Sequence, residues 1–284
     1  MKNAIVPILL VAFSTLAFAQ QQAPQPVKLN NITGNIYEAI NGRGARGGVF
    51  IGENGILVID TKQDQVSVQQ TLDEIRKLSD KPIKYLVNTH SDGDHVMGNQ
   101  FLPPGITIIA HANCRKDFFL LKRDGSPSDW SKPELLPFVP SITFYDRMDL
   151  YLGSKKVELW YFGIGHTTGD AVVYFPEEKT AFIGDQAFVG RTQLIHAYKG
   201  GNSFEHVKTL TKMLATLDAD KFISGHSEPL TREGVQKYID EMKSIQEKVK
   251  NLITQNKTLD ETKNEFETDK SALVEIIFNE IKSK

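Results

Sequence analysis

The fold of this chain is decided by the stretch THSDGDH, residues Thr89–His95. It follows the apolar run Ile83–Val87, which indicates a buried strand. The stretch therefore places two imidazoles and two carboxylates directly after the end of a strand. In α/β proteins, ligands and catalytic groups gather at the carboxyl ends of strands. The sequence thus predicts a functional site at this point.

Three further segments repeat this arrangement. Each places one polar residue after a predicted strand: His166 after Val157–Phe162, Asp185 after Thr180–Ile183 and His226 after Phe222–Ser224. Each has a glycine beside it, and glycine lets the backbone turn tightly enough to direct a side chain inward. One loop histidine is more often solvated or structural, but four such segments together indicate a metal site. The mixture of imidazole and carboxylate suits Zn, Fe or Mn rather than Ca or Mg.

Outside these segments, short apolar runs alternate with amphipathic ones. Val66–Leu78 and Ser203–Leu217 have helical spacing, and a helix is also expected from Asn113 to about Lys122. Residues Thr258–Glu261 have the form of a capping box, which predicts the start of another helix. The order of elements predicts one α/β domain with a helical C-terminal extension.

Composition excludes several classes of protein. The chain has 284 residues, of which 40% are hydrophobic and 24% charged, as in soluble globular proteins. Disorder, collagen and a multi-span membrane protein are therefore excluded. The 33 basic and 35 acidic residues give a net charge of -2, so no nucleic-acid partner is expected. Cys114 is the single cysteine, so no intrachain disulfide can form.

The N-terminus has the three parts of a secretory signal. Lys2 is followed by the apolar run Ala4–Phe13 and by small residues at Ala17 and Ala19, which predicts cleavage before Gln20. The alternative is a membrane anchor, but the run is shorter than the ~20 residues that a span needs. We expect an exported protein, periplasmic or secreted, with no membrane anchor after cleavage.

The motifs resemble, in order, those of the metallo-β-lactamase superfamily. They are THSDGDH at Thr89–His95, Gly165-His166-Thr167, Gly184-Asp185, Gly225-His226 and, as the first motif, Val58-Ile59-Asp60-Thr61. In the first motif an aspartate, here Asp60, supports the metal-binding loop. The resemblance spans residues 48 to about 230. It implies an αββα sandwich, with two mixed sheets face to face, helices outside and a metal site on one edge.

The N-terminal pattern and the resemblance together predict a domain organisation. Residues 1–19 would be the signal peptide and residues 20–26 a disordered leader. Residues 27–232 would form the catalytic domain of metallo-β-lactamase fold. Residues 233–284 would form a helical extension packed on the same domain.

Two metal sites are implied by the resemblance. The first would use His90, His166 and the residue at position 92, and the second Asp94, His95 and His226, with Asp185 bridging both. Most family members have histidine where this chain has Asp92, which would ligate directly or through water. A carboxylate there adds a negative charge and shifts preference toward Fe or Mn. Two Zn²⁺ ions are expected, with Fe or Mn as the alternative.

The leading hypothesis is an exported dinuclear metal-dependent hydrolase acting on a small molecule. A metal-bound hydroxide would attack an ester, thioester, lactone or amide-type bond. Asp94 is expected to be catalytic by orienting the nucleophile, and His196 to contact the substrate. His206 is expected on a helix surface, and His111 has either a structural role or a place beside the site. The sequence does not predict an oligomeric state.

Three other functions remain open. One is a β-lactamase, although residues 186–188 are Gln-Ala-Phe where known classes have a carboxylate-binding lysine. Another is a non-hydrolytic diiron redox protein, which Asp92 favours. The third is a binding protein with a degenerate site, which would hold no metal.

Overall fold

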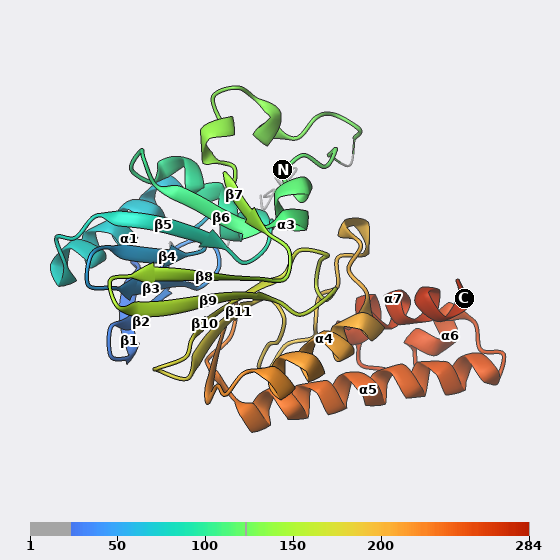
Figure 1. The fold of residues 1–284 in the computed structure, drawn as a ribbon. Helices are drawn as coiled ribbons and strands as arrows, with labels where there is room; N and C mark the ends of the chain where they lie inside the picture. The colour runs from blue at the N-terminus through green and yellow to red at the C-terminus, as the bar shows by residue number, and fades with distance from the viewer. Residues whose placement is uncertain (1–23, 123, 284) are drawn as a thin grey trace, which may run out of the picture.

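Two β-sheets pack face to face, with helices on both outer faces (Figure 1). The computed structural model describes residues 24–122 and 124–283. The αββα sandwich predicted from the sequence is therefore confirmed. The predicted signal peptide and residues 20–23 of the predicted leader lie outside the described residues. Residues 24–26 are exposed and have no regular secondary structure.

The first sheet has seven strands in chain order. They are β1 (Lys28–Thr33), β2 (Ile36–Ile40), β3 (Gly47–Ile51), β4 (Ile56–Ile59), β5 (Ile83–Asn88), β6 (Thr107–His111) and β7 (Ile142–Phe144). β1 to β4 pair antiparallel, whereas β4 to β7 pair parallel. The parallel half directs the carboxyl ends of β4 and β5 to the same edge.

The second sheet has six strands in the order β13-β12-β11-β10-β9-β8. They are β8 (Arg147–Leu152), β9 (Lys155–Tyr161), β10 (Ala171–Phe175), β11 (Thr180–Gly184), β12 (Lys221–Ser224) and β13 (Leu230–Thr231). β11 and β12 pair parallel, and the other neighbours pair antiparallel. The loops after β11 and β12 therefore leave the same edge of this sheet.

The predicted helices are present with one change in length, and the short helix α2 was not predicted. They are α1 (Gln65–Leu78), α2 (Gly93–Val96), α3 (Ala112–Asp117), α4 (Ser203–Thr216), α5 (Arg232–Thr254), α6 (Leu259–Lys263) and α7 (Ser271–Lys282). The predicted capping box at Thr258 and Glu261 is confirmed at the start of α6. The expected helix up to about Lys122 is wrong in extent. The chain leaves α3 where Phe118 turns inward and packs against Trp130, with ring centroids 5.0 Å apart.

Short 3-10 helices complete the described secondary structure. They are η1 (Met97–Phe101), η2 (Asp129–Ser131), η3 (Leu136–Phe138), η4 (Ala197–Lys199) and η5 (Thr268–Lys270). η2 and η3 lie in the long segment between α3 and β7. η4 lies in the loop between β11 and α4, which borders the site described below.

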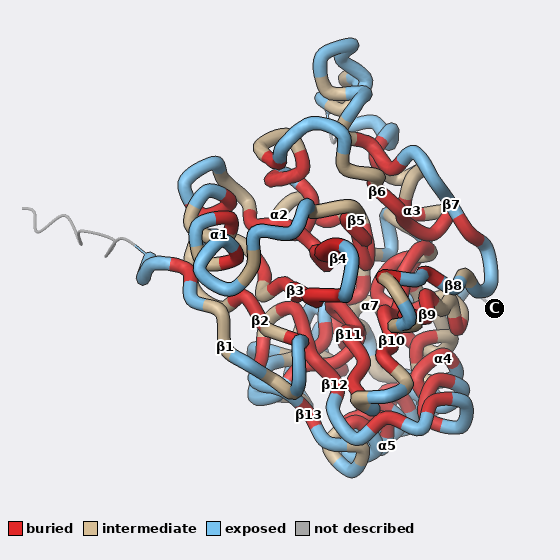
Figure 2. Tube along the Cα trace, turned by 60° about the vertical axis from the view of Figure 1, so that its left-hand side comes forward, coloured by how far each residue is buried: buried red, intermediate tan, exposed pale blue. Residues whose placement is uncertain are grey.

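The central strands of both sheets are buried (Figure 2). In each sheet their side chains alternate between two buried clusters. In β4, Leu57 and Ile59 face the second sheet, where they join a cluster with Phe175 of β10. Ile56 and Val58 face the other way and pack with α1. Because side chains alternate across a strand, a strand with apolar residues at every position is buried on both faces.

The helices α4, α5 and α7 cover the outer face of the second sheet (Figure 1). Ile183 of β11 belongs to the same buried cluster as Leu210 of α4, Ile239 of α5 and Ile277 of α7. The C-terminal helices therefore share a core with the sheet. Among the described residues, no helix is long and apolar enough to cross a membrane.

Candidate metal centre

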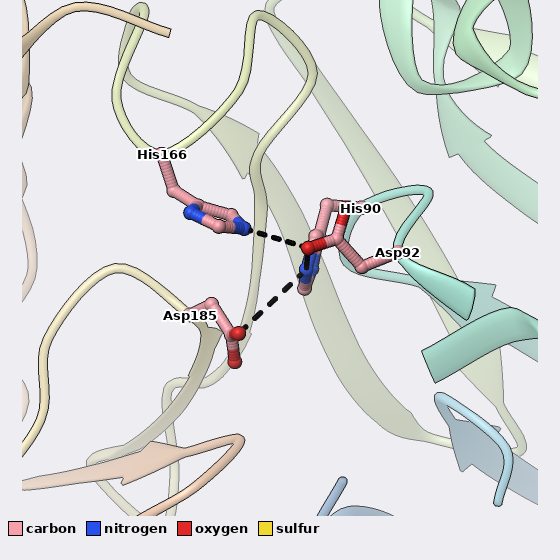
Figure 3. A group of neighbouring side chains, drawn as sticks. All are labelled: His90, Asp92, His166 and Asp185. Atoms are coloured by element: carbon pink, nitrogen blue, oxygen red, sulfur yellow. Dashed lines mark hydrogen bonds and ion pairs between the residues drawn. The ribbon is translucent and has the colours of Figure 1, made fainter. Parts of the chain in front are cut away.

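The side chains that the sequence predicts as metal ligands meet at one edge of the sandwich. Their donor atoms form two groups, and within each group all lie within 4.8 Å of one another. The first group contains His90, Asp92, His166 and Asp185 (Figure 3), and the second contains Asp94, His95 and His226. The structure thus brings together all seven residues that were predicted.

The first group is buried and tightly spaced. His166 Nε2 lies 3.0 Å from Asp92 Oδ2, and His90 Nε2 lies 3.5 Å from the same oxygen. His90 Nε2 also lies 3.9 Å from Asp185 Oδ2. His90 Nε2 is a buried nitrogen without a hydrogen-bond partner. An imidazole nitrogen buried in this way is costly unless it has a ligand.

Asp185 of the first group also lies close to the second group. His95 Nε2 lies 3.1 Å from Asp185 Oδ1, and His226 Nε2 lies 3.3 Å from Asp185 Oδ2. Asp94 Oδ2 lies 2.9 Å from His226 Nε2. Asp185 therefore contacts imidazoles of both groups.

Two imidazoles are oriented by partners on their far side. His95 Nδ1 lies 2.8 Å from Asp60 Oδ2, and His166 Nδ1 lies 2.6 Å from the carbonyl oxygen of Leu194. When Nδ1–H donates to these oxygens, the lone pair of each Nε2 faces its group, as in known metal sites. Leu194 lies in the loop after β11, so that loop orients a residue of the loop after β9.

Asp60 supports the THSDGDH stretch from below. Its carboxylate accepts hydrogen bonds from the Thr89 backbone N–H at 2.7 Å and from the Thr89 hydroxyl at 2.6 Å, as well as facing His95. Asp60 has φ of 54°, which is uncommon for a residue other than glycine. This strained backbone ends β4 and turns the buried carboxylate toward the stretch.

Two glycines are required by close approach. A Cβ atom at Gly225 would lie 2.3 Å from Asp185 Oδ1 and 2.6 Å from His95 Cε1. At Gly184, where φ is 54°, it would lie 2.6 Å from the Thr89 hydroxyl oxygen. The glycines of both motifs thus leave room for the side chains beside them.

The electrostatics of the cluster favour a positive charge within it. Burial opposes ionisation of Asp92, yet His90 and His166 hold its pKa well below the usual range. Burial likewise opposes ionisation of Asp185, but His95 and His226 lower its pKa. Burial lowers the pKa of His166, but the carboxylate of Asp92 outweighs it and raises that pKa to about 9. Ionised carboxylates, oriented imidazoles and the partnerless His90 Nε2 fit a divalent cation.

The surroundings of Asp92 include Lys199 of η4 and His196, which directly precedes η4. Lys199 Nζ lies 2.6 Å from Asp92 Oδ1, and His196 Nδ1 lies 3.2 Å from Asp92 Oδ2. His196, predicted to contact substrate, thus lies at the edge of the first group, with 14% of its side chain exposed. Lys199 was not predicted, because a lysine in an irregular loop carries no motif.

The other two histidines are structural. His206 was expected on the helix surface, and this is wrong: it is fully buried and its Nε2 donates to the Gln186 carbonyl oxygen at 2.7 Å. It precedes Leu210 by four residues and therefore shares the buried face of α4. His111 is buried, stacks on Tyr161 with ring centroids 3.8 Å apart and caps α3.

Comparisons with known proteins agree with this architecture. A family profile described as the metallo-beta-lactamase superfamily matches residues 48–226. A metallo-beta-lactamase type 2 of Bacteroides fragilis is 24% identical over 237 residues, which cover 80% of this chain and 90% of that protein. The crystal structure of the DIM-1 metallo-beta-lactamase has a TM-score of 0.63 at 17% identity, covering 78% of this chain and 99% of that one.

A further relative is named for a different activity. The 2,4-dinitroanisole O-demethylase subunit alpha of Nocardioides sp. (strain JS1661) is 26% identical over 188 residues, or 64% of this chain. The match spans about half of that relative, 52% of its length. The names of these relatives thus describe different reactions.

Proposed function

Because the chain belongs to the metallo-β-lactamase superfamily and is a metal-dependent hydrolase of that fold, we propose that it is an exported dinuclear enzyme. It would cleave an ester, thioester, lactone or amide-type bond of a small molecule. The observation that carries the dinuclear proposal is the position of Asp185. One oxygen lies 3.9 Å from His90 Nε2 and 3.3 Å from His226 Nε2, so a single carboxylate faces both donor groups.

The proposed ligand sets follow the two groups. His90, Asp92 and His166 would hold one zinc ion, and Asp94, His95 and His226 the other, with Asp185 shared between them. Bound divalent ions supply Lewis acidity toward the substrate oxygen and lower the pKa of water.

Asp94 has the most exposed carboxylate of the cluster, with 32% of its side chain accessible. Burial opposes its ionisation, but the hydrogen bond from His226 lowers the pKa of Asp94, so it is ionised at neutral pH. Its carboxylate would accept a hydrogen bond from the attacking water and orient it. His196, at the edge of the first group, would contact the substrate.

A β-lactam substrate is the second candidate. The relative from Bacteroides fragilis, named a metallo-beta-lactamase, aligns over 90% of its own length with this chain. A chromogenic cephalosporin tested beside the other substrates distinguishes the two candidates.

The proposal is tested by metal content together with hydrolysis. Protein purified without added metal should contain two zinc ions per chain by elemental analysis and should hydrolyse at least one of an aryl ester, a thioester and a lactone. Chelation should abolish turnover, and zinc should restore it.

A matched pair of variants tests the role of Asp94. Asp94→Asn should lower kcat by about 100-fold or more, the scale expected when the attacking water is misplaced. Asp240→Asn, at an exposed aspartate on α5, is the control and should keep full activity.

Two irons with a visible absorption band and no hydrolysis would contradict the proposed function, and so would the absence of any retained metal.

A further inference from the structure

Asp92 is one half of a buried ion pair. Its Oδ1 lies 2.6 Å from Lys199 Nζ, and the same ammonium donates to the Ser91 hydroxyl at 2.8 Å. Only 8% of the Lys199 side chain and 11% of the Asp92 side chain are exposed. The Lys199 ammonium therefore interacts with the THSDGDH stretch rather than with solvent.

The two oxygens of Asp92 have separate partners. Oδ1 faces Lys199, whereas Oδ2 faces His166 at 3.0 Å, His196 at 3.2 Å and His90 at 3.5 Å. A carboxylate held at one oxygen by an ammonium cannot rotate freely, so its second oxygen stays directed at these imidazoles. This is the orientation that a metal ligand at position 92 needs.

The ion pair also sets the charge of the first group. Leaving aside the shared Asp185, two neutral imidazoles and the Asp92 carboxylate carry a charge of -1, and the Lys199 ammonium offsets it. Three histidines in place of these residues would have the same net charge of zero. Removing either Asp92 or Lys199 alone would leave the other as a buried, uncompensated charge, which is strongly destabilising.

We propose that Lys199 is a positioning residue of the first metal group. Its ammonium holds Asp92 Oδ1, so that Oδ2 faces His90 and His166, and it offsets the charge of the carboxylate that stands in place of an imidazole. This inference rests on the proposed function, because it assigns a task at the same centre. It also implies that Asp92 does not by itself move the site toward iron or manganese.

The first test removes the ammonium and keeps the length of the side chain. Lys199→Met should weaken zinc binding at the first group by about 10–100-fold, as expected for loss of an outer partner of a ligand. We would measure it by competition with a chromophoric chelator. The midpoint of the pH–rate profile should move to higher pH, since an uncompensated negative charge raises the pKa of nearby acids. Lys199→Arg keeps the charge and should recover most of the affinity.

The second test removes both partners. Asp92→His alone leaves the Lys199 ammonium facing an imidazole, whereas Asp92→His combined with Lys199→Met leaves three histidines and no unpaired charge. Because the introduced imidazole does not depend on the ammonium for its orientation, the double variant should bind zinc more tightly than either single variant, a non-additive result. Lys208→Met, at an exposed lysine of α4 paired with Glu205, is the control and should match the wild type.

The outcomes separate this inference from the proposed function. If the wild type binds two metals but Lys199→Met matches the control in affinity and pH profile, the inference about Lys199 is overturned alone. If the wild type binds no divalent metal, both are overturned. If Lys199→Met does not fold, the double variant decides: a folded, zinc-binding double variant supports charge matching, and an unfolded one overturns it.

Discussion

At the scale of single residues, the centre depends on how each side chain is held from behind. The side-chain oxygens of Asp185 face three imidazoles, those of His95, His226 and His90. Asp60 orients His95 at the far side of its ring. Loss of Asp185 would remove a donor from the centre. Loss of Asp60 would leave the donors in place, but His95 would no longer be oriented.

Asp185→Asn tests the shared carboxylate. A neutral amide carries no charge to balance two dications, so metal content should fall from two to one or fewer per chain, and turnover should fall at least 100-fold. Elemental analysis and steady-state kinetics on the same preparation measure both. A variant that keeps two metals and full activity would remove Asp185 from the centre.

At the scale of elements, four loops converge because the strands before them end at one edge. The loops after β11 and β12 approach so closely that Gly225 has no room for a side chain: a Cβ would lie 2.3 Å from Asp185 Oδ1. The glycines are thus part of the packing between loops.

Gly225→Ala should separate those loops. Overpacking at a tight contact costs about 1–3 kcal/mol in the free energy of unfolding, and the shift of Asp185 should lower metal affinity as well. Gly234→Ala on α5 is the control, since the nearest atom to a Cβ there is 3.5 Å away. Denaturant unfolding and chelator competition measure the two effects, and equal behaviour of both variants would refute the packing argument.

His206 of α4 should make the stability of the folded protein depend on pH. Burial lowers the pKa of His206 to about 4, whereas an unfolded histidine titrates near 6.5. Protons therefore bind the unfolded chain more readily between these values, and stability should be lost as pH falls from 6.5 to about 4. The loss from this one group is on the order of 3 kcal/mol.

His206→Gln isolates that contribution, because glutamine retains an N–H donor for the Gln186 carbonyl and does not titrate. Unfolding free energies of the wild type and the variant, measured by denaturant between pH 4 and 7, should converge as pH falls. Parallel curves would show that His206 is not the group that titrates.

Sequence patterns predicted the strands that end at the site better than the elements around it. Apolar runs such as Ile83–Val87 end in polar motifs, so both the strand and its functional end are visible. β1 was not predicted, because its residues Lys28–Thr33 are only partly buried and mostly polar. Lys199 was missed because its burial depends on tertiary packing and leaves no periodic signal. The burial of His206 could have been predicted, because it precedes Leu210 by four residues on the apolar face of α4.

At the scale of the whole molecule, metal removal should loosen the sandwich. The THSDGDH stretch follows β5 of the first sheet, whereas Asp185 and His226 follow β11 and β12 of the second, so bound metal would tie the two sheets together at one edge. A ligand present at 1,000 times its Kd stabilises the folded state by about 4 kcal/mol. The chelated protein should therefore unfold at a lower temperature, and zinc should reverse the change. Identical melting curves with and without chelator would contradict this.

Export is a separate prediction for the whole chain. Processing before Gln20 would give a mature protein that begins with Gln20 or its cyclised form, found outside the cytoplasm. N-terminal sequencing or mass spectrometry of the exported protein measures this. An intact Met1 on exported protein would contradict the cleavage.

The central claim, a dinuclear centre sharing Asp185, is tested most directly by anomalous diffraction at the zinc edge. Crystals of the zinc-loaded protein should give two anomalous peaks in each chain. One should lie among His90, Asp92 and His166, and the other among Asp94, His95 and His226, both within bonding distance of the Asp185 carboxylate. A single peak, no peak, or two peaks that Asp185 does not join would contradict the account.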